Sequence, residues 1–352
     1  MDTFAPMKLE ERISAFSRLG EIISEGLHGR GPYHEKISLA IRNQHLVNPW
    51  FTPENVRLAF ESIAYSLGDN KLVKWINKYP GLPDGDSGSC VALVMAGNIP
   101  LVGFHDFITV LISGNKVLAR KSSKDPDLIE LIADILKGLN EEFSGLIEIT
   151  DGKISNFDLV IATGSDNTSR YFEYYFKKYP RIIRGNRNSV AVITGEETTR
   201  ELGLLGNDIF TYFGLGCRNV SRLYLPVGYD IKPLIQSWDK WEGIINHVKY
   251  ANNYDYYKAV FLVNREPFLD SGYILLHENS SLASPVGVIN FSYYNDRAKL
   301  EDELTSLSPK IQCIVGHGYL PFGTAQYPEL WDYADGTDTL DFILKKIGSG
   351  IS

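Results

Sequence analysis

The 352-residue sequence contains few sulfur-bearing residues, with three cysteines and three methionines. Cys90, Cys217 and Cys313 lie far apart, and an odd number of cysteines cannot form a fully paired disulfide framework. This usage is typical of a reducing compartment, so we expect a cytoplasmic location. The first residues also lack the basic segment and apolar run of a secretory signal peptide, and none is expected.

The sequence also lacks a long uninterrupted apolar run and an excess of positive charge. Its longest apolar stretch, residues 90–112, is broken by Gly97, Asn98 and Pro100, so we expect no membrane span. The 35 Lys and Arg residues are outnumbered by 43 Asp and Glu, with a net charge of −8, and the two signs are interspersed. Because phosphate backbones are bound by clustered Lys and Arg, we expect no nucleic-acid partner.

Motifs that mark several enzyme classes are missing. No histidine pair has metal-ligand spacing and the cysteines form no C-x-x-C, so no metal site is expected. The phosphate-binding loop G-x-x-x-x-G-K-[ST] and the nucleophile elbow G-x-S-x-G are absent as well. Any chemistry must therefore be argued from single residues and from their order along the chain.

The pattern of apolar residues predicts an α/β protein. A chain of this length favours two packed units with appendages. Residues 1–85 show apolar spacings of three and four, which indicate helices, and end in a Gly- and Asp-rich linker. Short apolar runs then alternate with helical stretches up to about residue 195, which predicts a parallel sheet with helices on both faces. A second unit covers residues 196–318, and an aromatic, acidic tail with a short helix covers residues 319–352.

The strongest candidate for a reactive group is Cys217. Gly214 and Gly216 precede it and let the backbone pass close to a ligand. Arg218 and Arg222 follow, and positive charge near a thiol favours the thiolate. A buried cysteine that acts only as a small apolar residue is the other interpretation.

A second candidate is Asn98, in the turn Gly97-Asn98-Ile99-Pro100 at the end of a predicted strand. Its side-chain amide can donate a hydrogen bond to a developing oxyanion. Asparagine is also common in turns before a helix, so a purely structural role stays open.

Polar residues follow two further predicted strands. Lys121, Ser122 and Ser123 come directly after the strand 116–120 and suit a ribose or a phosphate, although a solvated loop has the same composition. Gly164 and Ser165 stand between a strand and a helix, whose first N–H groups can bind a pyrophosphate. This second loop is not a full G-x-G-x-x-G motif.

The order of these features resembles the aldehyde dehydrogenase superfamily. The resemblance runs from the Asn98–Pro100 turn through Lys121 and Thr163-Gly164-Ser165 to Cys217, and ends at Pro321-Phe322-Gly323. Within the superfamily the chain is most similar to the acyl-CoA reductases of the bacterial luminescence (LuxC-type) family. The motifs that carry this likeness are Gly97-Asn98-Ile99-Pro100, Gly114-Asn115-Lys116-Val117, Lys121-Ser122-Ser123-Lys124-Asp125-Pro126 and Phe322-Gly323-Thr324-Ala325-Gln326.

Two departures bear on the expected reaction. Aldehyde-oxidising members have a glutamate that activates water, but residues 183–188 contain no carboxylate here, as a CoA-dependent enzyme would require. The glutamate that holds the nicotinamide ribose is replaced in residues 280–286 by a stretch without acids. The resemblance therefore leaves open which group holds that ribose.

The resemblance implies a Rossmann-type cofactor-binding domain over residues 86–195 and an α/β catalytic domain over 196–318. The N-terminal helical region and the tail flank them, and the tail either forms a homodimer contact or returns to the cofactor domain. The implied reaction reduces a fatty acyl-CoA or acyl-carrier thioester to the aldehyde through an acyl-enzyme. The alternatives are a CoA-acylating aldehyde dehydrogenase that oxidises with NAD, and an acyl transferase or thioesterase.

The implied site has Cys217 as nucleophile and Asn98 as oxyanion donor. NADPH is favoured as the cofactor, with NADH as the alternative, because Lys and Ser cluster after the strand 116–120 with no acid before Asp125. The residues implied to bind it are Pro100, Lys121, Ser122, Ser123, Gly164 and Ser165.

Overall fold

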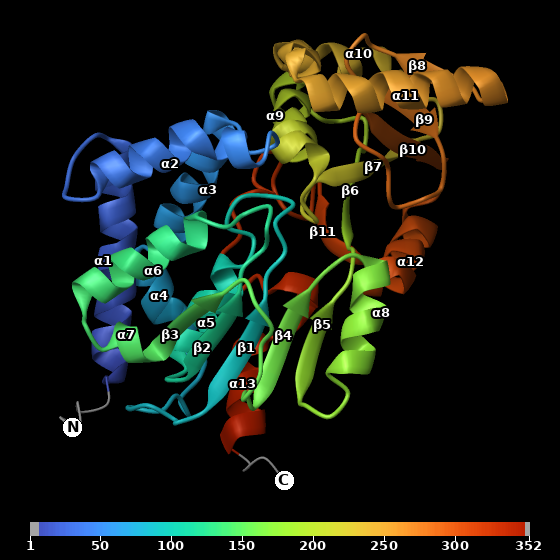
Figure 1. Ribbon diagram of the computed structural model, residues 1–352. Helices are drawn as coiled ribbons and strands as arrows, with labels where there is room; N and C mark the ends of the chain where they lie inside the picture. Colours follow the sequence, from blue (N-terminus) through green and yellow to red (C-terminus); the bar gives the residue numbers. More distant parts are fainter. Residues whose placement is uncertain (1–6, 349–352) are drawn as a thin grey trace. The chain divides into compact units, whose positions relative to one another are not determined.

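The computed structural model describes residues 7–348 and divides into two compact units. The first unit combines the chain up to Asn186 with the segment from Pro328 onward, and the second is Arg187–Tyr327. The predicted helical and cofactor-binding regions thus share one unit with the tail. Each unit is described separately below (Figure 1).

Four helices open the first unit, as the apolar spacing predicts. The stripe of α1 buries Phe16, Leu19 and Ile23 completely. The Thr52 hydroxyl accepts a 3.4 Å hydrogen bond from the Asn55 N–H and caps α3, which has Pro53 in its first turn. The helices are α1 (Leu9–Leu27), α2 (His34–Val47), α3 (Pro53–Ser66) and α4 (Asp69–Ile76).

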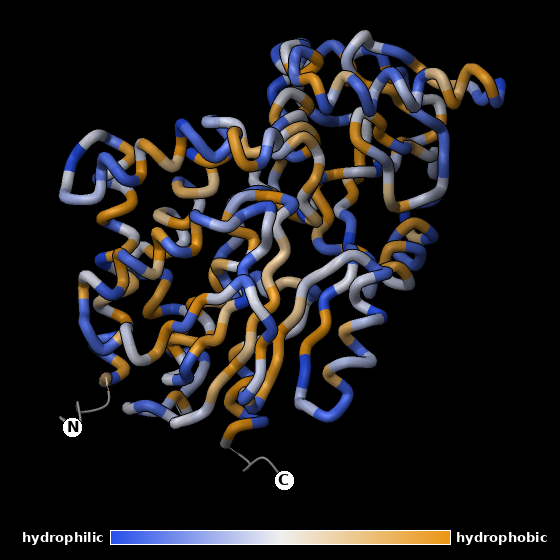
Figure 2. Tube along the Cα trace, in the orientation of Figure 1, coloured by the Kyte–Doolittle hydropathy of each residue, from blue (hydrophilic) through white to orange (hydrophobic). Residues whose placement is uncertain are grey.

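A five-stranded parallel sheet in the order β3-β2-β1-β4-β5 forms the centre of the first unit. Alternate residues of β1 enter different cores, with Val91 and Leu93 on one face and Ala92 and Val94 on the other. Both faces are therefore apolar, which agrees with the hydrophobic colouring of these strands in Figure 2. The strands are β1 (Cys90–Val94), β2 (Lys116–Arg120), β3 (Ile147–Thr150), β4 (Leu159–Thr163) and β5 (Arg181–Arg184).

Helices cover both faces of this sheet, as strand–helix alternation predicts. The core on one face includes Phe107 and Ile132, and the core on the other includes Phe172. α5 begins at Phe104 and not directly after Pro100, because Leu101 has a left-handed φ of 56° and cannot be part of a right-handed helix. The helices are α5 (Phe104–Ile112), α6 (Leu128–Leu139), α7 (Phe143–Leu146) and α8 (Asp166–Tyr175).

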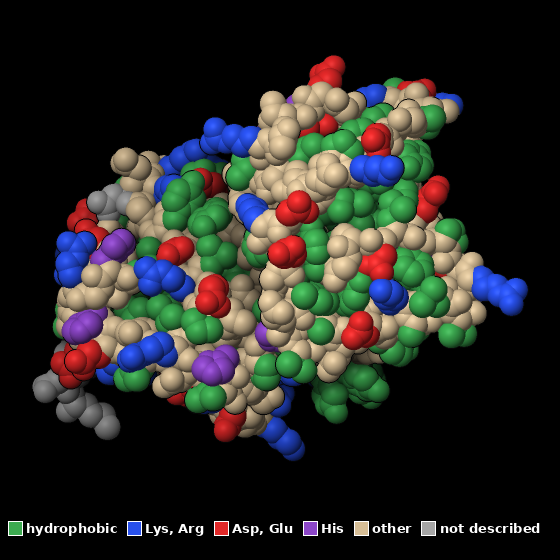
Figure 3. Space-filling view, turned by 90° about the horizontal axis from the view of Figure 1, so that it is seen from above, with side chains coloured by type: hydrophobic (Ala, Val, Ile, Leu, Met, Phe, Trp, Pro, Cys, Tyr) green, Lys and Arg blue, Asp and Glu red, His purple; other side chains and the backbone are tan. Residues whose placement is uncertain are grey.

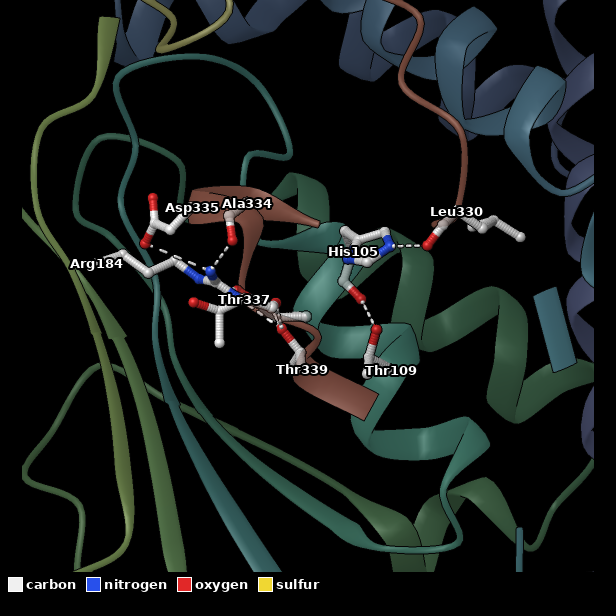
Figure 4. A network of polar contacts seen from close by, with 9 residues as sticks. His105, Thr109, Arg184, Leu330, Ala334, Asp335, Thr337 and Thr339 are labelled. Atoms are coloured by element: carbon white, nitrogen blue, oxygen red, sulfur yellow. Dashed lines mark hydrogen bonds and ion pairs between the residues drawn. The ribbon is translucent and has the colours of Figure 1, made fainter. Parts of the chain in front are cut away.

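The tail of the chain packs within the first unit, where α13 (Thr339–Gly348) contacts α5. The buried Arg184 guanidinium donates to the Thr339 hydroxyl at 2.7 Å and to the Ala334 carbonyl at 2.6 Å. His105 donates to the Leu330 carbonyl at 2.8 Å (Figure 4). The tail is therefore held by a network of polar contacts as well as by the apolar face of α13.

The second unit contains a six-stranded sheet in the order β11-β6-β7-β10-β9-β8. All neighbouring strands are parallel except β8 and β9, which are antiparallel. Alternation again separates two cores, since Leu223 and Leu225 enter one and Tyr224 the other. The strands are β6 (Asn188–Val192), β7 (Val220–Pro226), β8 (Phe268–Asp270), β9 (Leu275–Glu278), β10 (Val288–Tyr294) and β11 (Ile311–Val315).

Helices cover both faces of this second sheet. Leu205 and Trp238 belong to the core on one face, and Leu300 and Leu304 of α12 belong to the core on the other. The helix α11 carries the Tyr-rich segment and buries Tyr250 and Tyr254. The helical elements are α9 (Thr199–Phe210), η1 (Thr211–Gly214), α10 (Lys232–Gln236), η2 (Asp239–Asn246), α11 (Val248–Asn264), α12 (Arg297–Leu307) and η3 (Ser308–Lys310).

Two surface properties of the described residues bear on possible partners. None of the helices between residues 7 and 348 combines the length and apolar character that crossing a bilayer requires. On the face drawn in Figure 3, basic and acidic side chains are interspersed. The mixed signs agree with the interspersed charges of the sequence.

Candidate active site

The carboxyl edge of the first sheet brings most of the predicted cofactor residues onto neighbouring loops. β1 lies between β2 and β4 and pairs with both in parallel. The turn with Asn98 and Pro100 follows β1, Lys121 follows β2, and Gly164 follows β4. Parallel sheets bind ligands at this edge, so the three loops are placed where a dinucleotide would lie.

The loops after β1 and β2 pack tightly against each other. A Cβ atom on Gly97 would lie 2.5 Å from the Ser122 Oγ and 2.9 Å from its Cβ, so only glycine fits there. The Asn48 side-chain amide donates to the Lys124 carbonyl at 3.3 Å and approaches the Gly97 carbonyl at 3.5 Å. The turn that carries Asn98 is thus held directly against the loop of Ser122 and Ser123.

A buried carboxylate fixes the end of the same turn. Asp125 accepts a 2.9 Å hydrogen bond from the backbone N–H of Leu101, the residue with the left-handed φ. Burial raises the pKa of Asp125 to about 6, although hydrogen bonds from the Leu101 and Leu128 backbones lower it. Asp125 therefore supports an unfavourable backbone conformation three residues after Asn98.

Lys121 lies at the predicted position after β2 and forms an ion pair. Its Nζ is 2.5 Å from Oε1 of Glu130, and this hydrogen bond raises the pKa of Lys121. Its backbone N–H donates to the Thr150 carbonyl at 3.0 Å. The ammonium is therefore charged and oriented by an acid of α6, which a phosphate would have to displace.

Gly164 and Ser165 form the start of α8. The Ser165 hydroxyl caps the helix, accepting from the Thr168 N–H at 3.4 Å. A Cβ atom on Gly164 would lie 2.9 Å from the Thr168 Cβ, so glycine permits the tight strand-to-helix turn. A ten-residue helix with its N-terminus at the carboxyl edge fits a pyrophosphate, because the helix dipole favours negative charge there.

In the second unit, Cys217 lies on a short loop between η1 and β7. The thiol is half-buried and is not part of a disulfide. Tyr212, Phe213 and Gly214 all have left-handed φ angles, of 52°, 58° and 76°. Each non-glycine residue in this conformation costs roughly 1–2 kcal/mol. Strain of this kind is concentrated at functional sites, which makes the Cys217 loop the leading candidate in the second unit.

Asn219 fastens the Cys217 loop to the end of α9. Its buried side-chain amide donates to the carbonyls of Asp208, Ile209 and Thr211 at 3.1, 3.3 and 2.8 Å. Its Oδ1 accepts a 2.8 Å hydrogen bond from the Gly216 N–H, directly before the thiol. One side chain thus satisfies the C-terminal carbonyls of α9 and fixes the backbone that carries Cys217.

Arg218 and Arg222, the predicted cations near the thiol, both bind backbone carbonyls. The Arg218 Nε donates to the Ala325 carbonyl, at 2.5 Å. Arg222 donates to the Ser280 carbonyl at 2.7 Å. These contacts connect the Cys217 region to residues 280–286, where the ribose-binding glutamate is missing, and to residues 321–326, which carry part of the resemblance.

A second buried carboxylate supports the segment around Gly323. Asp208 accepts from the Gly323 N–H at 2.6 Å and from the Ala325 N–H at 2.9 Å. Burial raises the pKa of Asp208 to about 6, while these two hydrogen bonds and Arg218 lower it. Asp208, on α9, and Arg218, on the Cys217 loop, therefore both bind the backbone of this segment.

Sequence reasoning missed several residues that position the site. Asp125 and Asp208 resemble surface acids in the sequence, and only their contacts show that they are buried. Asn48 comes from a helical region that carried no site prediction. Asn219 had a local signal, since an asparagine in a turn next to glycines often bonds to nearby backbone groups. Among residues 7–348, no group of three His, Cys, Asp or Glu side chains could hold a metal ion.

The comparisons with known proteins agree with this architecture. Residues 75–232, a little under half of the chain, match the family model described as acyl-CoA reductase (LuxC). Among curated proteins, none matches the sequence. The match covers both the carboxyl-edge loops and Cys217, and it confirms the resemblance predicted from the motifs.

Solved aldehyde dehydrogenases share the fold. Aldehyde dehydrogenase 21 from Physcomitrella patens superposes with a TM-score of 0.62 at 13% identity, covering 89% of this chain and 74% of its own. Aldehyde dehydrogenase C from Pseudomonas syringae, solved with NAD+ and octanal, gives 0.62 at 12% identity over 88% and 72%. An enzyme from Mycobacterium tuberculosis, solved with NAD+, gives 0.58 at 13% identity over 82% and 70%.

These identities establish the fold alone, which is the predicted aldehyde-dehydrogenase-like α/β architecture. Together with the family match, the fold indicates an oxidoreductase that acts on an aldehyde or an acyl-CoA. A nicotinamide cofactor agrees with this class and with the loops at the carboxyl edge of the first sheet.

Proposed function

We propose that this chain, which matches the acyl-CoA reductases over residues 75–232, reduces a fatty acyl-CoA thioester to the aldehyde with NADPH. The observation that carries the proposal is the place of Cys217. This thiol lies within the matched segment, on a loop fixed by Asn219 and preceded by three left-handed residues. Such a loop suits a nucleophile that must hold one position during acyl transfer.

In the proposed reaction, the Cys217 thiolate attacks the thioester carbonyl carbon. The new carbon–sulfur bond forms first and leaves a tetrahedral oxyanion. When the oxyanion collapses, the bond to the CoA sulfur breaks, and the CoA thiolate leaves and takes up a proton. The side-chain amide of Asn98 and the backbone N–H of Cys217 stabilise the transient oxyanion. One such donor typically contributes ~3 kcal/mol, or about two orders of magnitude in rate.

The residues at the carboxyl edge of the first sheet fit a nicotinamide dinucleotide. Lys121, Ser122 and Ser123 would hold the adenosine ribose and its phosphate, and Gly164 and Ser165 the pyrophosphate, with Pro100 in the adjoining turn. The bound cofactor supplies the hydride that reduces the acyl group. A lysine and two hydroxyls with no acid before Asp125 favour NADPH over NADH.

The chain also has a feature that suits a water-sensitive acyl-enzyme. The segment 183–188 lacks a carboxylate, and its Arg184 is bound to Asp106 at 2.8 Å. That acid is therefore engaged in a structural ion pair. Because the segment 183–188 itself supplies no carboxylate to activate water, transfer and reduction are favoured over hydrolysis.

The decisive experiment compares Cys217→Ser with the wild-type protein in acyl-CoA-dependent NADPH oxidation. We expect at least a thousandfold loss of turnover, because a hydroxyl is a far weaker nucleophile at neutral pH. Cys90→Ser is the matched control, since this thiol lies at the amino end of β1, and it should retain activity. Activity of Cys217→Ser near the wild-type rate would overturn the proposal.

The same assay separates the other chemistries. A CoA-acylating dehydrogenase would prefer NAD+ and aldehyde, with higher catalytic efficiency in that direction. A transferase or thioesterase would release CoA without consuming NADPH. For Asn98→Ala we expect turnover to fall by about a hundredfold with an unchanged KM for NADPH.

The proposal includes a cytoplasmic homodimer that draws its acyl group from CoA or a carrier thioester. The three widely spaced cysteines, an odd number that suits a reducing compartment, support the location. Sedimentation velocity on the purified chain measures the assembly state.

A further inference from the structure

Ser189 places a buried hydroxyl in an otherwise apolar strand. It lies near the start of β6 and is fully buried, as are the Val190, Ala191 and Val192 side chains that follow it. Because a buried hydroxyl without hydrogen-bond partners costs free energy, apolar residues are the rule at such positions. The partners of this hydroxyl therefore decide what the serine does.

The Ser189 hydroxyl bonds to two segments, and each of them carries a cysteine. It donates its hydrogen to the backbone carbonyl of Cys217 at 2.9 Å. Its oxygen accepts a 3.2 Å hydrogen bond from the Cys313 N–H and lies 3.0 Å from the Cys313 Sγ. Because the one hydroxyl hydrogen is directed to Cys217, the S–H of Cys313 is the donor in the last contact. One buried side chain thus joins β11 to the backbone of the Cys217 loop.

The strand pairings of β6 are irregular at this same position. The register between β6 and β7 shifts between Ser189 and Val190. The register between β6 and β11 shifts between Ile311 and Ile314, a stretch that contains Cys313. Irregularities of this kind are frequent next to active sites, where they redirect a side chain. Here the Cys313 N–H bonds to a side chain of β6, the Ser189 hydroxyl.

The backbone is bonded to a buried side chain both before and after the thiol. Before it, the Asn219 Oδ1 accepts from the Gly216 N–H at 2.8 Å. After it, the Ser189 hydroxyl donates to the Cys217 carbonyl at 2.9 Å. We propose that Ser189 is a positioning residue, whose bond to the Cys217 carbonyl holds the thiol in the orientation that attacks the thioester. The inference rests on the proposed acyl transfer to Cys217.

The Ser189 bond reaches the carbonyl of Cys217 and not its sulfur, so it should affect orientation more than reactivity. Misplacing a reacting group by about 1 Å can lower a rate on the order of a hundredfold. A small reagent such as iodoacetamide reaches a thiolate from many directions and does not depend on that orientation. Loss of the hydroxyl should therefore slow acyl transfer and leave alkylation of the thiolate unchanged.

Two substitutions of Ser189 test this expectation. Ser189→Ala removes the hydroxyl, and Ser189→Thr retains it on a residue that suits a strand. Acyl transfer is measured as CoA released from octanoyl-CoA in a single turnover without NADPH. We expect Ser189→Ala to slow this release and kcat by about tenfold to a hundredfold, with the KM for NADPH within about twofold of wild type. Ser189→Thr should recover most of the loss.

The same variants are alkylated with iodoacetamide at a pH where the thiol is ionised, and mass spectrometry follows the Cys217 peptide. Its rate should stay within about twofold of wild type. Equal falls in CoA release and in alkylation would contradict the inference, because Ser189 would then control access to the sulfur. Circular dichroism checks folding. If Ser189→Ala does not fold, Ser189→Cys replaces it, since a thiol is a weak donor of similar size.

Ser237→Ala is the matched control. The half-buried Ser237 hydroxyl donates to the Leu234 carbonyl at 2.6 Å, so this variant also loses one serine–carbonyl bond, but at α10. It should keep the wild-type rates. Cys313→Ala removes the contact with β11 and leaves the bond from Ser189 to Cys217, so it should slow CoA release by less than about threefold. If Cys313→Ala and Ser189→Ala slow release equally, the contact with β11 is responsible and the inference is wrong.

Amide hydrogen exchange separates this inference from the proposed function, because it needs no substrate. Peptides that cover residues 214–219 should exchange faster in Ser189→Ala than in wild type or Ser237→Ala. If the wild-type chain releases no CoA but shows this difference, the proposed function fails together with the role of Ser189 in acyl transfer, and the anchoring of the loop stands. If these peptides exchange equally in all three proteins, Ser189 does not hold the loop and the inference fails, whatever the activity.

Discussion

The backbone N–H of Leu101 donates a 2.9 Å hydrogen bond to the carboxylate of Asp125, and this bond joins the loop after β1 to the loop after β2. Leu101 has a left-handed φ of 56°, so the bond supports a conformation that is unfavourable for leucine. Asn98 lies three residues before Leu101, and Lys121 four residues before Asp125. The proposed oxyanion donor and the proposed cofactor lysine are thus held in one rigid arrangement.

The raised pKa of Asp125 predicts how stability changes with pH. A carboxyl with a pKa of about 6 when folded and about 3.9 when unfolded binds more protons in the folded state between these values. The contribution of Asp125 to the free energy of unfolding therefore falls as pH rises from about 4 to about 6, and is constant above. Across this window the loss is about 3 kcal/mol at most.

Asp125→Asn should remove this dependence and keep the acceptor for Leu101. We expect the variant to gain stability relative to wild type as pH rises from 4 to 7, as measured by urea unfolding at each pH. Asp125→Ala loses the acceptor too, and should cost about 1–3 kcal/mol because the buried Leu101 N–H is left unsatisfied. A difference between Asp125→Asn and wild type that does not vary with pH would show that Asp125 is not protonated in this range.

Asn219 predicts a link between loop structure and thiol reactivity. Asn219→Ala leaves three carbonyls of the α9 end and the Gly216 N–H without their partner. We expect a loss of about 2–3 kcal/mol in stability. We also expect the pH profile of Cys217 alkylation to shift and kcat to fall with little change in the KM for NADPH. A purely structural role would change stability and leave the alkylation profile as in wild type.

Asn207→Ala is the matched control for this variant. Asn207 lies on the same helix, α9, and its Oδ1 accepts a 2.9 Å hydrogen bond from the exposed Lys240 ammonium. Asn207→Ala should leave the free energy of unfolding and the pH profile of Cys217 alkylation the same as in wild type, within experimental error. Equal effects of the two substitutions would point to α9 as a whole rather than to the Asn219 side chain.

The local parts of this architecture follow from the sequence. The apolar runs of β1, β2 and β4 and the polar residues after each predict a parallel sheet with a ligand edge, because that pattern depends on neighbouring residues. The cap of α3 at Thr52 is local as well. The Cys217 loop stands out for the same reason, since its glycines and asparagine are within a few positions of the thiol.

Features that depend on distant contacts could not be predicted. Asp208 binds the Gly323 and Ala325 N–H groups, more than a hundred residues later in the chain, and nothing in its neighbours indicates burial. β11, with the sequence Ile-Gln-Cys-Ile-Val, is short and partly polar, and it forms only because β6 provides a partner. β5 and β6 are three residues apart but belong to different sheets. Pairing rather than local sequence decides where the chain enters the second unit.

The Lys121–Glu130 ion pair predicts an effect on cofactor preference. If Lys121 binds the ribose phosphate of NADPH, Glu130 competes for the same ammonium. Glu130→Gln removes that competitor, so we expect the KM for NADPH to fall about threefold to tenfold while the KM for NADH changes little. Lys121→Ala should raise the KM for NADPH and leave NADH nearly unaffected.

Glu148→Gln is the control for Glu130→Gln. Glu148 forms a similarly short ion pair, 2.6 Å, with Lys116, which lies at the amino end of β2, whereas Lys121 follows its carboxyl end. Removing it changes the charge of the unit by the same amount without touching the carboxyl edge. Equal shifts in both variants would mean that net charge, and not Lys121, determines the affinity for NADPH.

The Arg184 network predicts that the tail separates from the first unit when this one side chain is lost. Arg184 is almost fully buried and forms an ion pair with Asp106, whose side chain is 13% exposed. Arg184→Met leaves that carboxylate uncompensated and should cost about 3–5 kcal/mol. We expect proteases to cleave the segment 328–338 faster in this variant.

Arg181→Met is the control, because Arg181 lies on the same strand but pairs with the exposed Glu173. This substitution should cost less than about 1 kcal/mol and leave cleavage unchanged. Adding Asp106→Leu to Arg184→Met should recover part of the loss, since the unpaired buried charge is then gone. Failure to recover any stability would place the main role of Arg184 in its bonds to Ala334 and Thr339 rather than in the ion pair.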